Sequence, residues 1–479
     1  KEYRRQRQMC IRDRYRLIYN QSTTMVIERR RTATAGRAAL PARKSRSMEN
    51  RRKKTATRTA DDNDPAGGTL VDARTAIERL GIKMQTLYAY VSRGWVRVVP
   101  AVGGKGNLYY VEDLDALAAR GRGRSMTGAG AERMIRWGGN AVMQTSITAI
   151  GPDGPRYRGK PAAELVLHHR TFEDCTELLW NGMLPDTSVA WQPARPGAGF
   201  QALADGIVQV AARNHSRRLL SVAVEAYAAS LGRNPELALG APTLAARQLI
   251  QAMAAATGLL TSQPTYALNE APQSIAQILA INLRVGDSPE HLRLLDAALI
   301  LSADNELAPA TFAARIAASA AADLFSCVTT ALGAFEGMLT GLGCEQAESA
   351  LGQARSRDAY LDHLKSLLAR KSPVPGFGHP IYPDGDPRAT LLLDLVREVA
   401  PAGPRGELAL QGVDQASNEL GLKPNLPLAL AVLAAVLDAP AGAAGALMSV
   451  GRAAGWVAHA LEQRLAGFLV RPRARYIGP

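Results

Sequence analysis

Between Pro242 and Leu351 the chain reads as one helix after another. Leu294 to Asp304 is predicted to form one helix, and the alanine-rich stretch from Thr311 to Leu332 a second, long one. Aromatic residues make up only 5% of the chain, whereas alanine and leucine are abundant, and this composition favours helices over a β-sandwich. We therefore expect a mostly all-α protein, and 479 residues are enough for two or three domains.

Hydrophobicity and cysteine spacing give a cytoplasmic prediction. The longest apolar run, Leu426 to Leu437, is shorter than the ~20 residues that a membrane span needs, and no signal peptide is visible. The four cysteines (Cys10, Cys175, Cys327 and Cys344) have neither metal-ligand nor disulfide-framework spacing. We expect no membrane partner, no metal and a reducing compartment.

The net charge of +14 is concentrated in the first 65 residues, which carry 19 basic and 7 acidic side chains. The remaining 414 residues carry 38 and 36, so the globular part is nearly neutral. Residues 1–65 have no sustained apolar period and are expected to be a disordered basic leader. Because the chain begins with Lys1, and Met25 and Met48 are alternative starts, this leader is expected to be irrelevant to function and possibly artefactual.

Residues 69–121 are predicted to form a separate small unit. A first helix with an apolar face ends at Gly81, and a second runs from Met84 to Ser92. The segment Trp95 to Val111, with three glycines at its turn, predicts a β-hairpin wing, and Glu112 to Arg120 predicts a third helix.

This unit resembles winged helix-turn-helix domains of the MerR/excisionase type, chiefly through the phrase QTLYAYVSRG. If it binds DNA, the candidates for contacts are Gln85, Thr86, Tyr88, Tyr90 and Arg93 on the second helix, with Lys105 and Arg97 on phosphate. Acidic neighbours offset the basic residues, so weak binding per protomer is expected. The alternative is an interaction module that does not touch DNA.

One loop carries most of the chemistry. Pro375 to Tyr382 reads PGFGHPIY, which places His379 among glycines and prolines, and Arg388 follows nine residues after it. Glycines let backbone approach a ligand closely, and prolines stiffen the loop. Arg388 offers a planar fork for a carboxylate. The pattern predicts a site for a carboxylate ligand with a polarised oxygen.

Other blocks accompany this loop in order. A β-hairpin is predicted from Thr145 to Gly159 around a Gly-Pro-Asp-Gly turn, and a helix beginning at Phe172 is predicted to end at Leu184-Pro185. Near the C-terminus stand GRAAGW, beginning at Gly451, and RPRARY, beginning at Arg471. With these blocks the chain resembles the citrate synthase family from about Ser146 to Gly478.

The resemblance implies a citrate-synthase-like body with a large domain (130–340 and 438–479) and a small domain (341–437) that close over substrate. It also implies a homodimer, and acetyl-CoA as cosubstrate with no other bound cofactor. His379 would polarise the ketone of oxaloacetate. The remaining implied contacts are Pro375, Gly376, Phe377 and Gly378 for the cosubstrate, and Arg388, Arg452 and Arg471 for carboxylates, the last of these reaching into the partner's site.

Three positions depart from the family pattern. Thr340 stands where the enolate-stabilising histidine is usual, Asn305 where a substrate-binding histidine is usual, and Pro427 where the catalytic aspartate is usual. A positioned acid or base typically contributes ~10²–10⁴-fold to rate, and proline can neither accept nor donate a proton. Asp414, Asp384 and Glu345 are the carboxylates that could approach in space as replacements.

Three functions remain open. The chain could be a citrate synthase with weak, altered or partner-dependent activity. It could be a non-catalytic, DNA-binding sensor of di- or tricarboxylates. It could also complete the active site of an intact paralogue in a heteromer, by lending Arg471.

Overall fold

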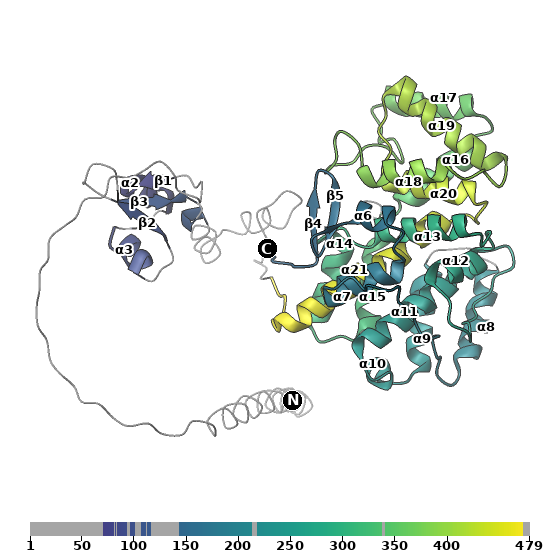
Figure 1. The fold of residues 1–479 in the computed structure, drawn as a ribbon, viewed down its shortest axis with the longest axis horizontal. Coiled ribbons are helices and arrows are strands. Elements are labelled where there is room, and N and C mark those ends of the chain that lie inside the picture. The colour runs from purple at the N-terminus through teal and green to yellow at the C-terminus, as the bar shows by residue number, and fades with distance from the viewer. Residues whose placement is uncertain are drawn as a thin grey trace, which may run out of the picture. The chain divides into compact units, whose positions relative to one another are not determined.

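The structure is a computed structural model that describes residues 70–80, 82, 84–92, 96–100, 107–111, 113–115, 143–212, 218–337 and 341–472. The chain divides into two compact units, Lys1–Met126 and Thr127–Pro479. Figure 1 shows their elements. The predicted basic leader, residues 1–65, lies outside the described residues.

In the described part of the smaller unit, the named elements are two helices and three short strands. Its elements are β1 (Leu70–Asp72), α2 (Ala73–Leu80), α3 (Met84–Ser92), β2 (Val98–Pro100) and β3 (Asn107–Tyr110). The strands form an antiparallel sheet in the order β1-β3-β2. Both predicted helices and the pairing of the predicted hairpin are confirmed, whereas β1 was not predicted. Of the predicted third helix, Glu112 to Arg120, residues 113–115 are described and helical.

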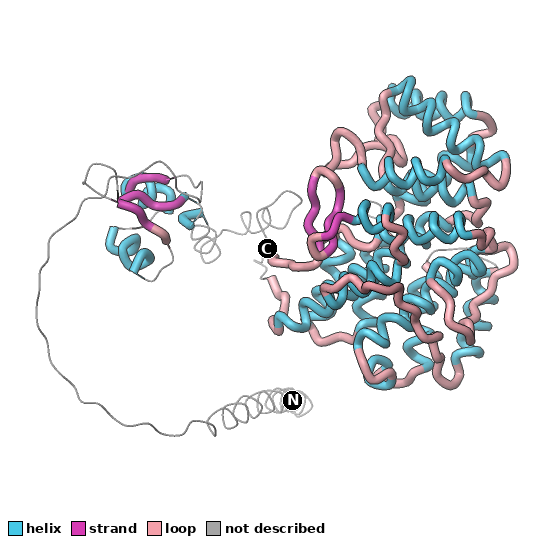
Figure 2. Tube along the Cα trace, in the orientation of Figure 1, coloured by secondary structure: helices cyan, strands magenta, loops and turns pink. Residues whose placement is uncertain are grey.

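The larger unit is almost entirely helical (Figure 2). Its strands are β4 (Thr148–Gly151), β5 (Gly154–Tyr157) and β6 (Lys160–Pro161), and its helices are α6 (Ala162–Leu167), α7 (Phe172–Asn181), α8 (Phe200–Ala211), α9 (Leu219–Ser230), α10 (Pro235–Ala238), α11 (Pro242–Ala256), the 3-10 helix η1 (Thr257–Leu260), α12 (Ile275–Leu283), α13 (Pro289–Ser302), α14 (Pro309–Ser319), α15 (Leu324–Phe335), α16 (Gly343–Gln353), α17 (Arg357–Ala369), α18 (Pro387–Arg397), α19 (Pro404–Leu420), α20 (Leu426–Val436) and α21 (Ala443–Ala466).

Helix α21 is the central element of this unit (Figure 1). It packs against α7, α13, α14, α15 and α20, and almost every residue from Ala443 to Ala460 is buried. Two of its glycines explain the close packing. A Cβ at Gly451 would lie 2.8 Å from the carbonyl oxygen of Leu299, and one at Gly455 would lie 2.5 Å from that of Ala303. Alanine and glycine therefore bring α21 against the end of α13, where the candidate site lies.

Three helix boundaries differ from the sequence predictions. The long helix predicted from Thr311 to Leu332 is two helices, α14 and α15, because Ala321 is left-handed (φ 62°) and Asp323 caps α15 through Ser326 N. Helix α7 ends at Asn181, before the predicted Leu184-Pro185, because Gly182 adopts the left-handed C-cap. Helix α13 starts before Leu294, at Pro289, behind the cap Ser288.

A buried and a half-buried carboxyl group lie where α7, α12 and α13 meet. Glu173 Oε1 accepts a hydrogen bond from Ile275 N (2.6 Å), and Asp296 Oδ1 accepts one from Phe172 N (2.9 Å). Burial, with the nearby Asp174, raises the pKa of Glu173 to about 7. Burial and Glu173 likewise raise the pKa of Asp296.

Glu173 is therefore expected to make stability depend on pH. Its carboxyl titrates near 4.5 when unfolded and about 7 when folded, so its contribution is complete below pH 4.5 and is lost as pH rises through 7. The shift corresponds to roughly 3 kcal/mol. Melting temperatures should be measured from pH 4.5 to 8. As pH rises, the melting temperature of Glu173→Gln should increase by several degrees relative to the wild type, whereas that of the exposed control Glu164→Gln should change with pH as the wild type does. Parallel curves for Glu173→Gln and wild type would contradict this assignment.

Candidate functional site

The histidine loop is pinned to the segment that leads into α20. Gly378 N donates to Lys423 O (2.8 Å), and Asn425 N donates to Gly376 O (3.0 Å). Gly376 and Gly378 both have positive φ, 82° and 75°. A Cβ on Gly376 would also lie 2.8 Å from the Leu428 side chain. The two glycines are therefore required for the conformation that presents His379.

His379 is held as a neutral hydrogen-bond donor. Its Nδ1 lies 3.2 Å from Ile381 N, which can only donate, so the ring proton is on Nε2. Burial and the positive charge of Arg388 lower the pKa of His379, which keeps the ring neutral at pH 7. Its ring packs on Tyr382 with centroids 4.9 Å apart. A neutral Nε2–H is the form needed to polarise a ketone oxygen, the role that the family resemblance implies for His379.

Arg388 forms a buried ion pair and uses three of its five N–H donors within the chain. Its Nε and Nη2 donate to the two carboxylate oxygens of Asp386 at 2.9 Å each, and its Nη1 donates to Asn305 Oδ1 at 3.2 Å. Asp386 is the N-cap of α18 and also accepts from Leu426 N. Burial opposes ionisation of Asp386, but Arg388 outweighs it and the net effect lowers the pKa of this carboxyl. The pair fixes the fork of Arg388 within the site.

Arg452 is a buried cation in this region with unpaired hydrogen-bond donors. It is 7% exposed, and its Nε and Nη1 have no hydrogen-bond partner among the described residues. Burial and the neighbouring Arg388 lower the pKa of Arg452 to about 10. Burying a guanidinium with unpaired N–H donors costs free energy, and an anionic ligand is well suited to accept hydrogen bonds from these donors.

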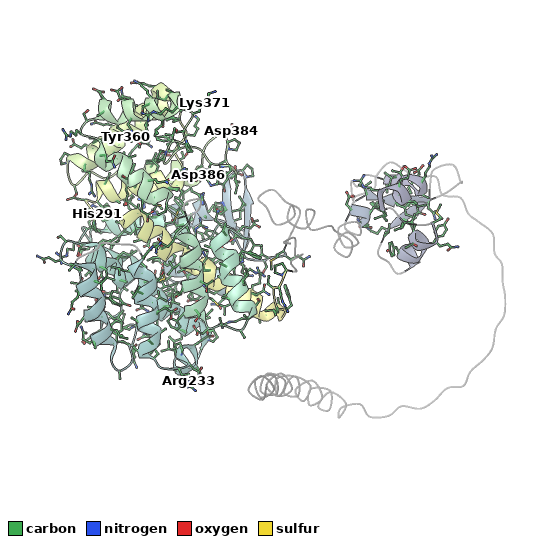
Figure 3. The ribbon with its side chains drawn as sticks, turned by 180° about the vertical axis from the view of Figure 1, so that it is seen from behind. Arg233, His291, Tyr360, Lys371, Asp384 and Asp386 are labelled. Atoms are coloured by element: carbon green, nitrogen blue, oxygen red, sulfur yellow. The ribbon has the colours of Figure 1, made fainter. Side chains whose placement is uncertain are left out.

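Two of the three candidate replacements for the missing base at Pro427, Asp414 and Asp384, are surface carboxylates. Asp414 pairs with Arg397 at the surface, and Asp384 is exposed in its loop (Figure 3). Glu345 is half-buried on α16, one turn before Glu348, with which it interacts electrostatically. Leu426 N, next to Pro427, donates to Asp386 Oδ2, and both oxygens of Asp386 are already bonded to Arg388.

Pro427 lies beside the start of α16. A Cβ on Gly343 would lie 3.4 Å from Pro427 Cγ, so the start of α16 and the start of α20 touch. Thr340 itself lies outside the described residues, as do Arg93 and Lys105. Within the described residues, no group of three or more His, Cys, Asp or Glu side chains could hold a metal ion.

Arg471 does not belong to the site of its own chain. It is exposed, and α21 extends from Arg452 to Ala466 before the chain reaches it. At 1.5 Å per residue that helical stretch alone is about 20 Å long. The structure therefore brings together His379, Arg388, Arg452 and Asn305, and leaves Arg471 outside.

Several groups at the site were not predicted from sequence. They are Asp386, Tyr382, Asp304, His459 and Tyr157. Asp386 carried a usable signal, because an aspartate directly before Pro-Arg is a typical helix N-cap. Asp304 and His459 are 155 residues apart, and nothing local marks them as a pair.

The fold and site define a mostly helical protein in which two buried arginines, Arg388 and Arg452, lie close to a neutral histidine. The sequence-family model described as "Citrate synthase, C-terminal domain" matches residues 136–473 of this chain. The chain therefore belongs to the citrate synthase family. No family match supports the winged helix-turn-helix assignment of residues 69–121.

Curated relatives are similar over most of their length. "Putative citrate synthase 2" of Mycobacterium tuberculosis is 28% identical over 354 residues, 71% of this chain and 92% of that protein. The 2-methylcitrate synthase of Shewanella oneidensis is 28% identical over 377 residues, 74% and 96% respectively.

Solved structures show the same fold. Citrate synthase of Thermotoga maritima superposes with a TM-score of 0.53 at 25% identity, covering 71% of this chain and 94% of that one. Citrate synthase of Thermoplasma acidophilum, solved with carboxymethyl coenzyme A and oxaloacetate, superposes with a TM-score of 0.57 at 21% identity, with the same coverage.

None of the described helices is long and apolar enough to cross a membrane.

Proposed function

We propose that this chain is a cytoplasmic citrate synthase homologue that binds oxaloacetate or citrate and condenses oxaloacetate with acetyl-CoA only weakly by itself. The observation that carries the proposal is Arg452, buried with two free donors. It lies in one site with the neutral His379 and with Arg388. These groups suit a ligand with a ketone or hydroxyl oxygen and at least two carboxylates.

The condensation needs a proton removed from the acetyl methyl, a donor for the enolate oxygen, and a donor for the ketone. His379 supplies the last through Nε2–H, and the arginines hold the carboxylates. Proline at 427 supplies no base, and threonine at 340 can donate a hydrogen bond but cannot carry charge as imidazole does. Binding is thus retained while proton abstraction is impaired.

The test measures both properties on one preparation. Calorimetry with oxaloacetate and with citrate should show saturable binding. Release of the CoA thiol from acetyl-CoA and oxaloacetate should run at least ~10²-fold below ordinary citrate synthase turnover, the typical cost of one missing acid or base. No heat with either ligand would remove the binding proposal.

A second candidate is a partner subunit, favoured by the exposure of Arg471 and its distance from Arg452 along α21. Co-expressed with a full-length paralogue, the chain should co-purify as a heteromer. Arg471→Ala should then lower the heteromer's activity by at least ~10²-fold, as expected for losing a charged carboxylate contact. Exposed Arg405→Ala serves as the control, and failure to co-purify removes this candidate.

For the smaller unit we propose a helix-turn-helix type of DNA contact through α3. Gln85 and Tyr88 are exposed there, and Thr86 is half-buried. Against strong binding, each arginine in the described part of this unit pairs with an acid: Arg74 with Glu78, Arg79 with Asp115 and Arg97 with Asp113. A gel shift on the gene's own promoter, with and without citrate, tests whether the chain acts as a carboxylate sensor.

A further inference from the structure

One face of α21 connects the carboxylate site to a buried polar network. Arg452, Gly455 and His459 are three and four residues apart, so they share this face. The face packs on the turn after α13, where Gly455 N donates to Ala303 O (3.0 Å). A Cβ on Gly455 would lie 2.3 Å from Asp304 Oδ1, so glycine allows Asp304 to sit directly against the helix.

Asp304 holds the turn that presents Asn305. It is fully buried, and its Oδ2 accepts from His459 Nε2 (3.3 Å) and from Glu306 N (3.0 Å). Its backbone N donates to the hydroxyl of Tyr157 (3.3 Å). Asn305, the next residue, receives the Arg388 hydrogen bond. The position of Asn305 in the site therefore depends on Asp304.

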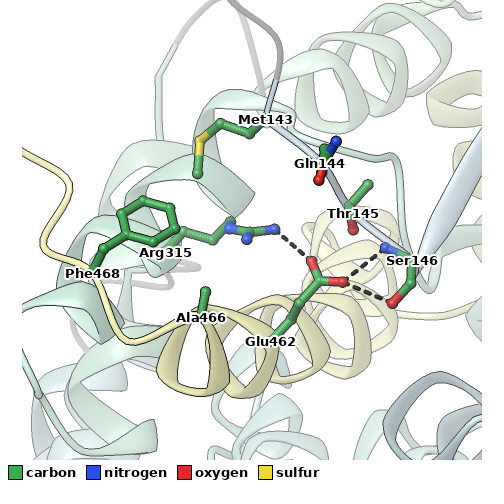
Figure 4. A pocket seen from close by; sticks show the side chains of 8 residues that line it. All are labelled: Met143, Gln144, Thr145, Ser146, Arg315, Glu462, Ala466 and Phe468. Atoms are coloured by element: carbon green, nitrogen blue, oxygen red, sulfur yellow. Dashed lines mark hydrogen bonds and ion pairs between the residues drawn. The ribbon is translucent and has the colours of Figure 1, made fainter. Parts of the chain in front are cut away.

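The partner of His459 fixes its tautomer. His459 Nδ1 lies 3.2 Å from Arg315 Nη1, and a guanidinium only donates, so Nδ1 accepts and the proton is on Nε2, facing Asp304. Arg315 in turn binds Glu462 Oε2 at 2.7 Å. Glu462 Oε1 accepts from the backbone N and hydroxyl of Ser146. Figure 4 shows this end of the network, in the wall of a surface pocket of about 930 Å³.

Within this network, the negative charge of Asp304 is available to stabilise the positive charge of Arg452. Arg315 and Glu462 neutralise each other, and the ring of His459 accepts at Nδ1 and donates at Nε2. Arg452 is three residues from Gly455, about 4.5 Å along the helix axis. The carboxylates that stabilise its charge are Asp304 and Asp386, and Asp386 already forms two hydrogen bonds with Arg388.

We infer that Asp304, held by His459, is a positioning residue that keeps Arg452 charged and directed into the carboxylate site. The contribution of Asp304 to ligand binding rests on the function proposed above. The electrostatic pairing of Asp304 with Arg452 is independent of that function, because the pairing exists without ligand. The two parts can therefore be tested separately.

The first test is a double-mutant cycle on the melting temperature of the full chain without ligand. Asp304→Asn should lower the melting temperature by several degrees, because it leaves Arg452 buried without its counter-charge. In an Arg452→Gln background, Asp304→Asn should lower the melting temperature by less than half as much as it does in the wild type. Additive losses would overturn the inference.

Two further variants keep this cycle decisive. Glu348→Gln removes another buried carboxylate that accepts hydrogen bonds from Gly442 N and Ala444 N at the other end of α21, and it should be additive with Arg452→Gln. If Asp304→Asn alone does not fold, His459→Ala takes its place in the cycle. His459→Ala frees Asp304 from its donor, and the same coupling with Arg452 is expected.

The second test measures citrate binding by calorimetry at pH 7.5 and 9.5. The ionisable groups that face Arg452 are Arg388, Asp304, Tyr157 and Asp386. Wild-type affinity should fall by less than about 3-fold over this range. The affinity of Asp304→Asn should fall by at least about 4-fold, as expected when removal of a counter-charge lowers the pKa of Arg452 from about 10 by one unit. Equal falls overturn the positioning role, whereas absence of wild-type binding refutes the proposed function and leaves the cycle to decide the pairing.

Discussion

The double change Thr340→His and Pro427→Asp is expected to raise thiol release from acetyl-CoA and oxaloacetate by ~10²–10⁴-fold, the usual contribution of a positioned acid or base. The aspartate would stand in the first turn of α20, where a negative charge favours the helix and no backbone donor is lost. Gly343 leaves room beside position 427, because even a Cβ there would lie 3.4 Å from Pro427 Cγ. The measurement is the steady-state rate of the purified chain.

The matched control is Thr340→His with Pro427→Asn. Asparagine has the size and helix-start preference of aspartate but cannot act as a base at neutral pH. We expect this control to stay within a few-fold of the parent rate, a difference of less than about 1 kcal/mol in barrier. A gain as large as that of the aspartate variant would show that the base was not what the chain lacked.

Replacing Arg388 with methionine is expected to lower affinity for oxaloacetate and citrate by ~10²-fold or more, since two charge-assisted hydrogen bonds are worth at least about 3 kcal/mol. It should also destabilise the fold by roughly 3–5 kcal/mol, because Asp386 would remain buried without its partner. Calorimetry and thermal melting measure the two effects on the same sample.

Two variants separate binding from stability at this pair. Asp386→Asn together with Arg388→Met should recover part of the melting temperature but none of the affinity. Arg397→Gln removes an arginine that is paired at the surface with Asp394 and Asp414, and it should change either quantity little. Recovery of affinity in the double variant would mean that Arg388 only supports the fold.

The helical class and the histidine loop could be predicted from sequence because their causes are local. Helical spacing and composition identify the helices, and the glycines around His379 are needed for two left-handed residues and for contact with Leu428. His379 and Arg388 could be assigned to one site because only nine residues separate them in the sequence. Arg452 joins them only through the tertiary fold.

The features that sequence did not predict have tertiary causes or break local rules. The break between α14 and α15 sits at Ala321, and alanine is normally the strongest helix former. Strand β1 is three residues long and is defined by its pairing with β3. Asp304 and His459 meet because α21 packs against the end of α13, and the missing partners of Arg452 are visible only when its burial is known.

The central claim is that this chain binds the carboxylate substrate at a site that lacks the base for condensation. The most direct measurement is exchange of the acetyl-CoA methyl protons with deuterated water, followed by NMR with oxaloacetate present and its binding confirmed by calorimetry in the same buffer. We predict saturable oxaloacetate binding with methyl exchange no faster than in a protein-free control. Rapid exchange by the purified chain would contradict the account, because it would show that a base removes the proton without an aspartate at position 427.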